Sequence, residues 1–315
     1  MCIRDSFHVA RRRDLDAVMA ATTPPVFVAL AARIGSKLSN ASFVYHMQDI
    51  YPEVLSANTG KQLGIFQRIL RKVDGQNTKR SDRVVVLSRD MKKTLGQRHS
   101  TDNVSVINNF LPDSDHGAET STLQTTRWKQ GSLQVIFAGN LGNFQGLENV
   151  VDAFKLLAKD GVAAHLVLLG SGAAEKSLRQ QAGGMLDTTI FFPGRVSQAE
   201  AESAVSSSDL ALVTLNSGVI GTAFPSKTMT YLSCGTPVLA AVESNSELAE
   251  LLTSEKVGSS CELDSSAIAA AIAAHVADPE ISRDVVIAVA HSYACLLYTS
   301  PSPRDATLSR MPSSA

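Results

Sequence analysis

The segment LQVIFAGNLGNFQGLENVVDAFKLLAK, residues 133–159, contains the pattern that decides the fold. It begins with a short apolar run over 133–138, which is typical of a buried strand. A turn containing Gly139, Gly142 and Gly146 follows, and apolar residues then recur at helical spacing over 147–159. A strand, a glycine-rich turn and a helix in this order predict one unit of a parallel sheet with its crossover helix.

The same alternation extends along the rest of the chain. After residue 132 the expected strands are Leu133–Ala138, His165–Leu169, Thr189–Phe192, Leu210–Thr214 and Pro237–Ala240, and the expected helices between them are Leu147–Lys159, Ala174–Ala182, Gln198–Ser206, Ser226–Ser233 and Asn245–Leu252. Weaker runs before residue 110 lie at Asp16–Ala20, Phe43–His46, Arg83–Leu87 and Val104–Ile107. The pattern predicts an α/β protein with two Rossmann-like, doubly wound domains facing a cleft.

The ends and the middle of the chain set the expected domain boundaries. Residues 1–6 and 295–315 resemble translated sequencing-adapter DNA, so we exclude both tails as non-native. The polar stretch 110–131 lacks periodicity and reads as a linker between an N-terminal acceptor-side domain at 7–109 and a C-terminal domain at 132–294. We expect the first domain to be truncated before residue 7, and the fragment by itself to be inactive.

Composition excludes several classes of function. The chain has 29 basic and 30 acidic residues; without the tails these become 26 and 28, a net charge of −2. This balance argues against a nucleic-acid partner. Only Cys234 and Cys261 remain outside the tails, too few for a disulfide framework or a zinc site. No apolar stretch approaches the roughly 18 residues of a spanning helix.

Two helix starts are candidate phosphate sites. Gly139, Asn140 and Gly142 stand after the first strand of the quoted segment, where glycine lets the backbone approach a phosphate and free N–H groups attract its charge. A tight turn without a ligand would give the same pattern. Ser226 can cap the helix expected at 226–233 while Lys227 directs a cation at an anion. The alternative is that Ser226 only caps and Lys227 is solvated.

Several motifs in order resemble glycosyltransferase family 4, in particular the bacterial exopolysaccharide and O-antigen branch of the colanic acid type. The motifs are FPSKTMTYLSCGTPVLAAVESNSELAELL (224–252), FAGN (137–140), QGLE (145–148), LLGSG (168–172), FPGRV (192–196), SDL (208–210), QDIYPE (48–53) and VINNF (106–110). The resemblance covers nearly all of the chain between the tails and implies the GT-B fold.

The resemblance also implies roles for single residues. Gly139, Asn140 and Gly142 would line the donor diphosphate, Arg195 and Val196 would contact the base, and Pro225, Ser226, Lys227 and Thr230 would form the phosphate end of the donor pocket. The chain departs from the family pattern at four positions. Asn140 and Gln145 stand where much of the family has Arg and Lys, and Thr222 and Thr230 replace a Glu-x7-Glu pair.

The implied activity is retaining transfer of a hexosyl or N-acetylhexosaminyl group from a nucleotide-sugar to a polyprenyl-diphosphate-linked or polysaccharide acceptor. No cofactor or metal is expected, so backbone dipoles and cations must meet the charge of the leaving diphosphate. Because the loop cations are missing, Lys227 is the expected catalytic cation. A nucleotide-sugar 2-epimerase of the same fold and a non-catalytic nucleotide-sugar-binding protein remain alternatives.

On the acceptor side, Asp49, Tyr51 and Glu53 follow the strand expected at 43–46. Asp49 and Glu53 could meet the attacking hydroxyl or orient the sugar, and we take both as catalytic candidates. A capped turn is the alternative, because Asp49 and Pro52 are both common at helix starts. His46, within an apolar strand, is more typical of a core residue.

The stretch from Lys61 to Arg80 alternates basic and apolar residues at helical spacing. Such a helix could lie on an anionic inner leaflet, and enzymes of the branch that the chain resembles commonly act on lipid-linked acceptors. We therefore expect a cytoplasmic protein that associates peripherally with the inner face of the plasma membrane. A plain solvated helix is the alternative.

Overall fold

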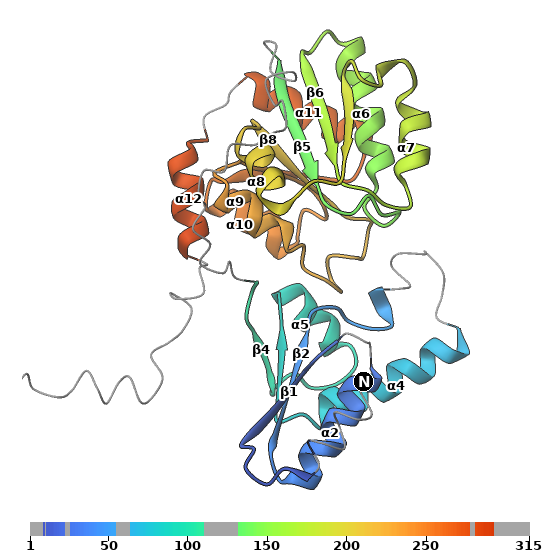
Figure 1. Cartoon of the computed structure of the whole chain (residues 1–315), viewed down its shortest axis with the longest axis vertical. Helices are drawn as coiled ribbons and strands as arrows, with labels where there is room; N and C mark the ends of the chain where they lie inside the picture. Colours follow the sequence, from blue (N-terminus) through green and yellow to red (C-terminus); the bar gives the residue numbers. More distant parts are fainter. Residues whose placement is uncertain are drawn as a thin grey trace, which may run out of the picture.

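The computed structural model describes residues 9, 11–22, 26–54, 64–109, 132–277 and 281–292. The expected linker at 110–131 and both expected tails lie outside the described residues. The described chain forms two parallel sheets in separate lobes, which lie one above the other in Figure 1. The α/β class expected from the sequence is thereby confirmed.

The first lobe contains a four-stranded sheet in the order β1-β2-β3-β4. Its strands are β1 (Ala17–Ala21), β2 (Ser42–Met47), β3 (Arg83–Val86) and β4 (Val104–Val106), and the helices are α2 (Phe27–Ser39), α4 (Ile65–Lys79) and α5 (Arg89–Gly96). In β2 the buried residues Phe43, Tyr45 and Met47 alternate with more exposed ones. This alternation places one face of β2 in the core.

The second lobe contains a six-stranded sheet in the order β10-β9-β8-β5-β6-β7. Its strands are β5 (Leu133–Ala138), β6 (Ala164–Leu169), β7 (Ile190–Gly194), β8 (Leu210–Thr214), β9 (Val238–Ala241) and β10 (Gly258–Cys261). Its helices are α6 (Leu147–Lys159), α7 (Glu175–Ala182), α8 (Gln198–Ser206), α9 (Lys227–Ser233), α10 (Glu247–Ser254), α11 (Ser265–Ala277) and α12 (Arg283–Ser292), with a 3-10 turn η2 (Gly183–Met185). The strand order reverses between β5 and β8, which is where open α/β sheets bind ligands.

Every strand and helix whose bounds were expected in the second lobe is present, with ends shifted by at most two residues. β10 was not expected. Its sequence, GSSC, is small and polar and carries no hydrophobic alternation. Its pairing with β9 brings it into the sheet, which is a long-range contact that no local pattern reveals.

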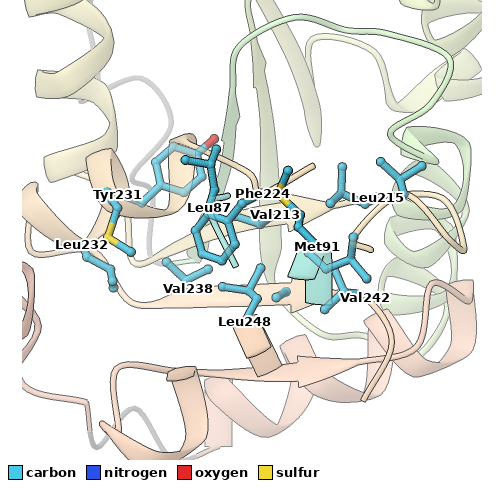
Figure 2. Packing of buried hydrophobic residues seen from close by; sticks show 14 of the residues in the cluster. Leu87, Met91, Val213, Leu215, Phe224, Tyr231, Leu232, Val238, Val242 and Leu248 are labelled. Atoms are coloured by element: carbon cyan, nitrogen blue, oxygen red, sulfur yellow. The ribbon is translucent and has the colours of Figure 1, made fainter. Parts of the chain in front are cut away.

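An apolar cluster joins the two lobes. Leu87 and Met91 come from the first lobe, and Val213, Phe224 and Leu248 come from the second. Figure 2 shows these side chains gathered in one cluster. The two lobes therefore share a hydrophobic core, and their carboxyl-end loops lie on either side of the junction.

Candidate functional site

Glycines fix the shape of the loop that follows β5. Gly139 has φ +141, and a Cβ on Gly170, at the end of β6, would lie 1.9 Å from the Gly139 carbonyl oxygen. A Cβ on Gly172 would lie 2.3 Å from the Leu141 oxygen. The loops after β5 and β6 therefore pack backbone against backbone, and no larger residue fits.

The same loop exposes polar groups where it leads into α6. Asn140 is exposed, whereas Gly142 lies buried behind it. A Cβ on Gly142 would approach the Asn140 Nδ2 to 3.0 Å. Gly146 caps α6 in a left-handed conformation with φ +61. The first turn of this 13-residue helix can thus present backbone N–H groups to an anion.

Lys227, the first residue of α9, reaches the glycine-rich loop. Its Nζ donates to Gln145 Oε1 at 2.9 Å and lies 3.7 Å from the ring centroid of Phe137. A Cβ built on Gly139 would lie 3.5 Å from the same Nζ. The loop after β5 and the start of α9, more than 80 residues apart in the sequence, therefore meet at one point.

The surroundings of Lys227 change its protonation. Burial lowers the pKa of Lys227 to about 7. α9 is also anchored to β5 by Tyr231, whose hydroxyl donates to the Ala138 oxygen at 2.9 Å and accepts from the Ala138 N–H at 2.8 Å. The lysine is therefore held firmly and can gain a proton when an anion arrives.

The remaining predicted donor residues lie at or near the same edge of the sheet. Arg195 is exposed just after β7, and Val196 packs partly against the core. Pro225 is partly buried two residues before α9, and Thr230 is partly buried in the middle of this helix. For Ser226 the expected cap is wrong. It stands directly before α9, but within the described chain its side chain makes no capping bond, because its backbone has a helical conformation and an N-cap residue needs an extended one.

Asp49 lies where the two lobes touch. It pairs with Ala223 in an isolated antiparallel bridge, and the Ile50 N–H donates to the Thr222 oxygen at 2.8 Å. Burial raises the pKa of Asp49, and both burial and the nearby Asp49 charge raise the pKa of Tyr51. The structure thus brings Asp49 to the segment that leads into α9.

Glu53 occupies a different setting from Asp49. Both of its carboxylate oxygens accept from Arg98, and Arg71 lies 3.0 Å from one of them. Arg98, which is only 4% exposed, also donates to Asp74 at 2.7 Å and to the Tyr51 oxygen at 2.8 Å. Glu53 is therefore part of a mostly buried ionic network that holds the backbone next to Asp49. Sequence spacing did not reveal this partner.

Two helix starts face each other across the lobes. The Arg89 N–H at the start of α5 donates to the Glu247 carboxylate, and the Glu247 N–H at the start of α10 donates to Asp90 Oδ2 at 2.8 Å. Arg89 Nη2 also donates to Glu250 at 2.7 Å. Each helix thus receives an acidic cap from the other lobe, which favours the observed docking of the lobes.

This arrangement, in which the carboxyl edges of two parallel sheets meet at a junction, is the GT-B fold. The crystal structure of Anabaena Alr3699/HepE in complex with UDP matches 91% of this chain and 77% of its own, with a TM-score of 0.72 and 19% identity. The complex of the same protein with UDP-glucose matches 97% and 82%, with a TM-score of 0.72 and 18% identity.

Residues 132–278 match the family model described as glycosyl transferases group 1. WbjE of Pseudomonas aeruginosa, which is named as a glycosyltransferase, is 27% identical over 262 residues, covering 80% of this chain and 64% of WbjE. WcaI of Escherichia coli K12, which is named for colanic acid biosynthesis, is 27% identical over 257 residues, covering 77% and 61%. The chain therefore spans less than two thirds of the length of these relatives.

Proposed function

We propose that the chain belongs to a glycosyltransferase that moves a sugar from a nucleotide-sugar to an acceptor in bacterial surface polysaccharide biosynthesis. The observation that carries the proposal is the meeting of Lys227 with the glycine-rich loop, 2.9 Å from Gln145 Oε1. The amine lies beside the backbone of Gly139 at the point where the strand order reverses, which is where open α/β sheets bind ligands. The relatives WbjE and WcaI support the same class of activity.

The donor diphosphate would lie between the α6 start and Lys227. Gly139, Asn140 and Gly142 would line it, and Lys227 would give N–H donors to its oxygens. As the glycosidic bond breaks, negative charge grows on the diphosphate, and the ammonium stabilises it. We propose that this occurs without a metal or other cofactor. In the described chain, no group of three or more His, Cys, Asp or Glu residues is arranged to hold a metal ion.

The remaining donor contacts are assigned to residues near the carboxyl edge of the second-lobe sheet. Arg195 and Val196 after β7 would face the base, and Pro225, Ser226 and Thr230 would complete the phosphate end. UDP in the complexes of Anabaena HepE supports a uridine nucleotide as the first probe. We propose a hexosyl or N-acetylhexosaminyl donor and retaining stereochemistry, as in the family that the motifs resemble.

On the acceptor side we propose that Asp49 meets the attacking hydroxyl. Its partial burial and raised pKa suit a carboxyl group that exchanges a proton or a hydrogen bond with an alcohol. Glu53 would act through Arg98, which holds the backbone at Tyr51. The acceptor would be a polyprenyl-diphosphate-linked or polysaccharide chain.

We further propose that α4 lies on the anionic inner leaflet, as a peripheral attachment. Its exposed side chains include Ile65, Phe66 and Ile69 at 80%, 66% and 56% exposure, beside Arg68 and Lys72. Apolar groups can enter the interface while basic groups meet lipid phosphates. Among the described residues no helix is long and apolar enough to span a bilayer. Failure to sediment with anionic liposomes at low salt would favour a solvated helix instead.

UDP binding by the chain tests the donor site, and the variant Lys227→Ala tests its central residue. We expect UDP to raise the melting temperature of the wild type and to do so much less for Lys227→Ala. Lys159→Ala, at the exposed end of α6, is the control. No stabilisation of the wild type by UDP, GDP or ADP would refute the donor site.

Turnover tests the activity, in a protein extended to the length of the relatives. Sugar transfer that is lost in Lys227→Ala supports the proposal, whereas normal transfer by that variant would refute the catalytic role of Lys227. Formation of a 2-epimer without any acceptor would indicate the epimerase. Donor binding with neither hydrolysis nor transfer would indicate a binding protein.

A further inference from the structure

Asn216, two residues after β8, makes two hydrogen bonds to the glycine-rich loop and packs closely against Gly146. Its backbone N–H donates to the Phe144 oxygen at 3.0 Å, and its Nδ2 donates to the Asn143 oxygen at 3.2 Å. Its Oδ1 lies 2.9 Å from the position that a Cβ on Gly146 would occupy. The asparagine therefore fixes the part of the loop that also carries Gln145, the partner of Lys227.

The loop that begins at Asn216 reaches the first lobe at its other end. The Asn216 oxygen accepts from the Val219 N–H at 3.1 Å, and the Val219 oxygen accepts from the Thr222 N–H at 2.8 Å. The Thr222 oxygen then accepts from the Ile50 N–H, next to Asp49. A short series of backbone hydrogen bonds thus runs from the donor loop to the acceptor segment.

The Glu243 carboxylate, two residues after β9, accepts hydrogen bonds from the middle of the connection between Asn216 and Thr222. Glu243 Oε1 accepts from the Gly218 N–H at 2.6 Å and from the Ser217 hydroxyl at 3.3 Å. The connection is therefore held at the glycine-rich loop, at β9 and at the first lobe. A continuous series of hydrogen bonds of this kind can carry energetic coupling between two sites.

We propose that Asn216 is a positioning residue that fixes the donor loop relative to the segment carrying Asp49. It acts through the loop that holds Gln145 and Lys227, without touching the donor. The inference rests on the proposed function, because it assumes that a diphosphate binds at this loop. It goes further by making the donor site depend on the docking of the first lobe.

Calorimetric titration with UDP tests the role of Asn216. Asn216→Ala removes one hydrogen bond to the loop, and we expect UDP binding to weaken by about threefold to tenfold. Asn216→Asp should weaken it more, because a carboxylate would then face the Asn143 oxygen in place of an amide donor. Asn103→Ala is the matched control, since the Asn103 amide donates to the Thr78 and Ser81 oxygens at 3.0 and 2.9 Å within the first lobe.

The control should lower the melting temperature of the ligand-free chain and leave the Kd for UDP unchanged. Equal Kd values for the wild type and Asn216→Ala would overturn the inference. Equal weakening by Asn216→Ala and Asn103→Ala would also overturn it, because the effect would then be general destabilisation. Absence of UDP binding by the wild type would instead refute the proposed function.

A larger side chain between the lobes tests whether UDP binding depends on the docking of the first lobe. A Cβ on Gly221 would lie 3.0 Å from Thr94 Oγ1 of α5, so Gly221→Val should push the connection away from the first lobe. We expect weaker UDP binding by Gly221→Val and partial recovery when Thr94→Ala is added. UDP binding that is unaffected by the wedge would contradict transmission through this connection.

Discussion

The pH dependence of UDP binding gives the sharpest test of Lys227. In the empty site its pKa is about 7, so at pH 8 about nine tenths of the chains carry the neutral amine. A diphosphate in contact with the amine favours the ammonium and raises its pKa again. Binding should therefore take up about 0.9 proton at pH 8 but only about 0.1 proton at pH 6 through this residue.

The affinity for UDP should depend on the protonation of Lys227 in the same way. Below pH 7 the ammonium is already present, so the contribution of Lys227 is nearly constant. Above pH 7 the association constant should fall by about tenfold per pH unit, as long as the pKa of the bound state stays higher than the pH. Lys227→Met, which preserves chain length without a titrating group, should lose this slope.

Calorimetry in two buffers with different ionisation enthalpies measures the proton uptake directly. The UDP phosphate itself titrates near pH 6, so the quantity to compare is the difference between wild type and Lys227→Met at pH 8. Lys159→Met, at an exposed site, should behave as the wild type. Equal proton uptake by wild type and Lys227→Met at pH 8 would refute the assignment.

Two further predictions concern stability, and a third concerns UDP binding. Lys227→Met should raise the melting temperature of the ligand-free chain, and more at pH 6 than at pH 9. A lysine whose pKa is lowered in the folded state reduces the free energy of unfolding by about 1.4 kcal/mol per pH unit as the pH falls from the unfolded-state pKa towards 7. Thermal unfolding with the opposite pH trend would contradict this. Arg98→Met should lower the free energy of unfolding, measured in urea, by about 3–5 kcal/mol, because Asp74 loses its ion-pair partner. The double variant Arg98→Met with Asp74→Asn should lose less stability. Equal losses would count against a buried ion pair. Gly170→Ala should abolish UDP binding, because its Cβ would lie 1.9 Å from the Gly139 carbonyl oxygen. Gly184→Ala, which has open space around it, should bind UDP normally. UDP binding retained by Gly170→Ala would show that the loop adapts.

The sequence predicted the fold well because each unit of the second lobe carries its own periodic signal. β5, its glycine turn and α6 could be recognised from residues 133–159 alone, and their bounds agree with the structure. β10 has no such signal, since GSSC becomes a strand only by pairing with β9. Local patterns predict elements, whereas edge strands depend on tertiary contacts.

The candidate site was predictable only in part. The positions of Gly139 and Lys227 after strand and helix boundaries could be read from the sequence, and the structure brings them together. Partners distant in sequence could not be predicted: Asn216 lies 73 residues from Asn143, and Arg98 lies 45 from Glu53. The ionic partner of Glu53 changes the role that we propose for that residue from direct contact to support of a loop.

The crossed caps of α5 and α10 constrain any attempt to recombine such lobes. Ser88 and Ser246 cap α5 and α10 from within their own lobes, while Asp90 and Glu247 each accept one further N–H from the helix start of the other lobe. A chimera that takes one lobe from a relative imports a helix start without its matching acid. Successful exchange of lobes should therefore require that Asp90 and Glu247 be matched as a pair, even though neither residue lies in the proposed donor site.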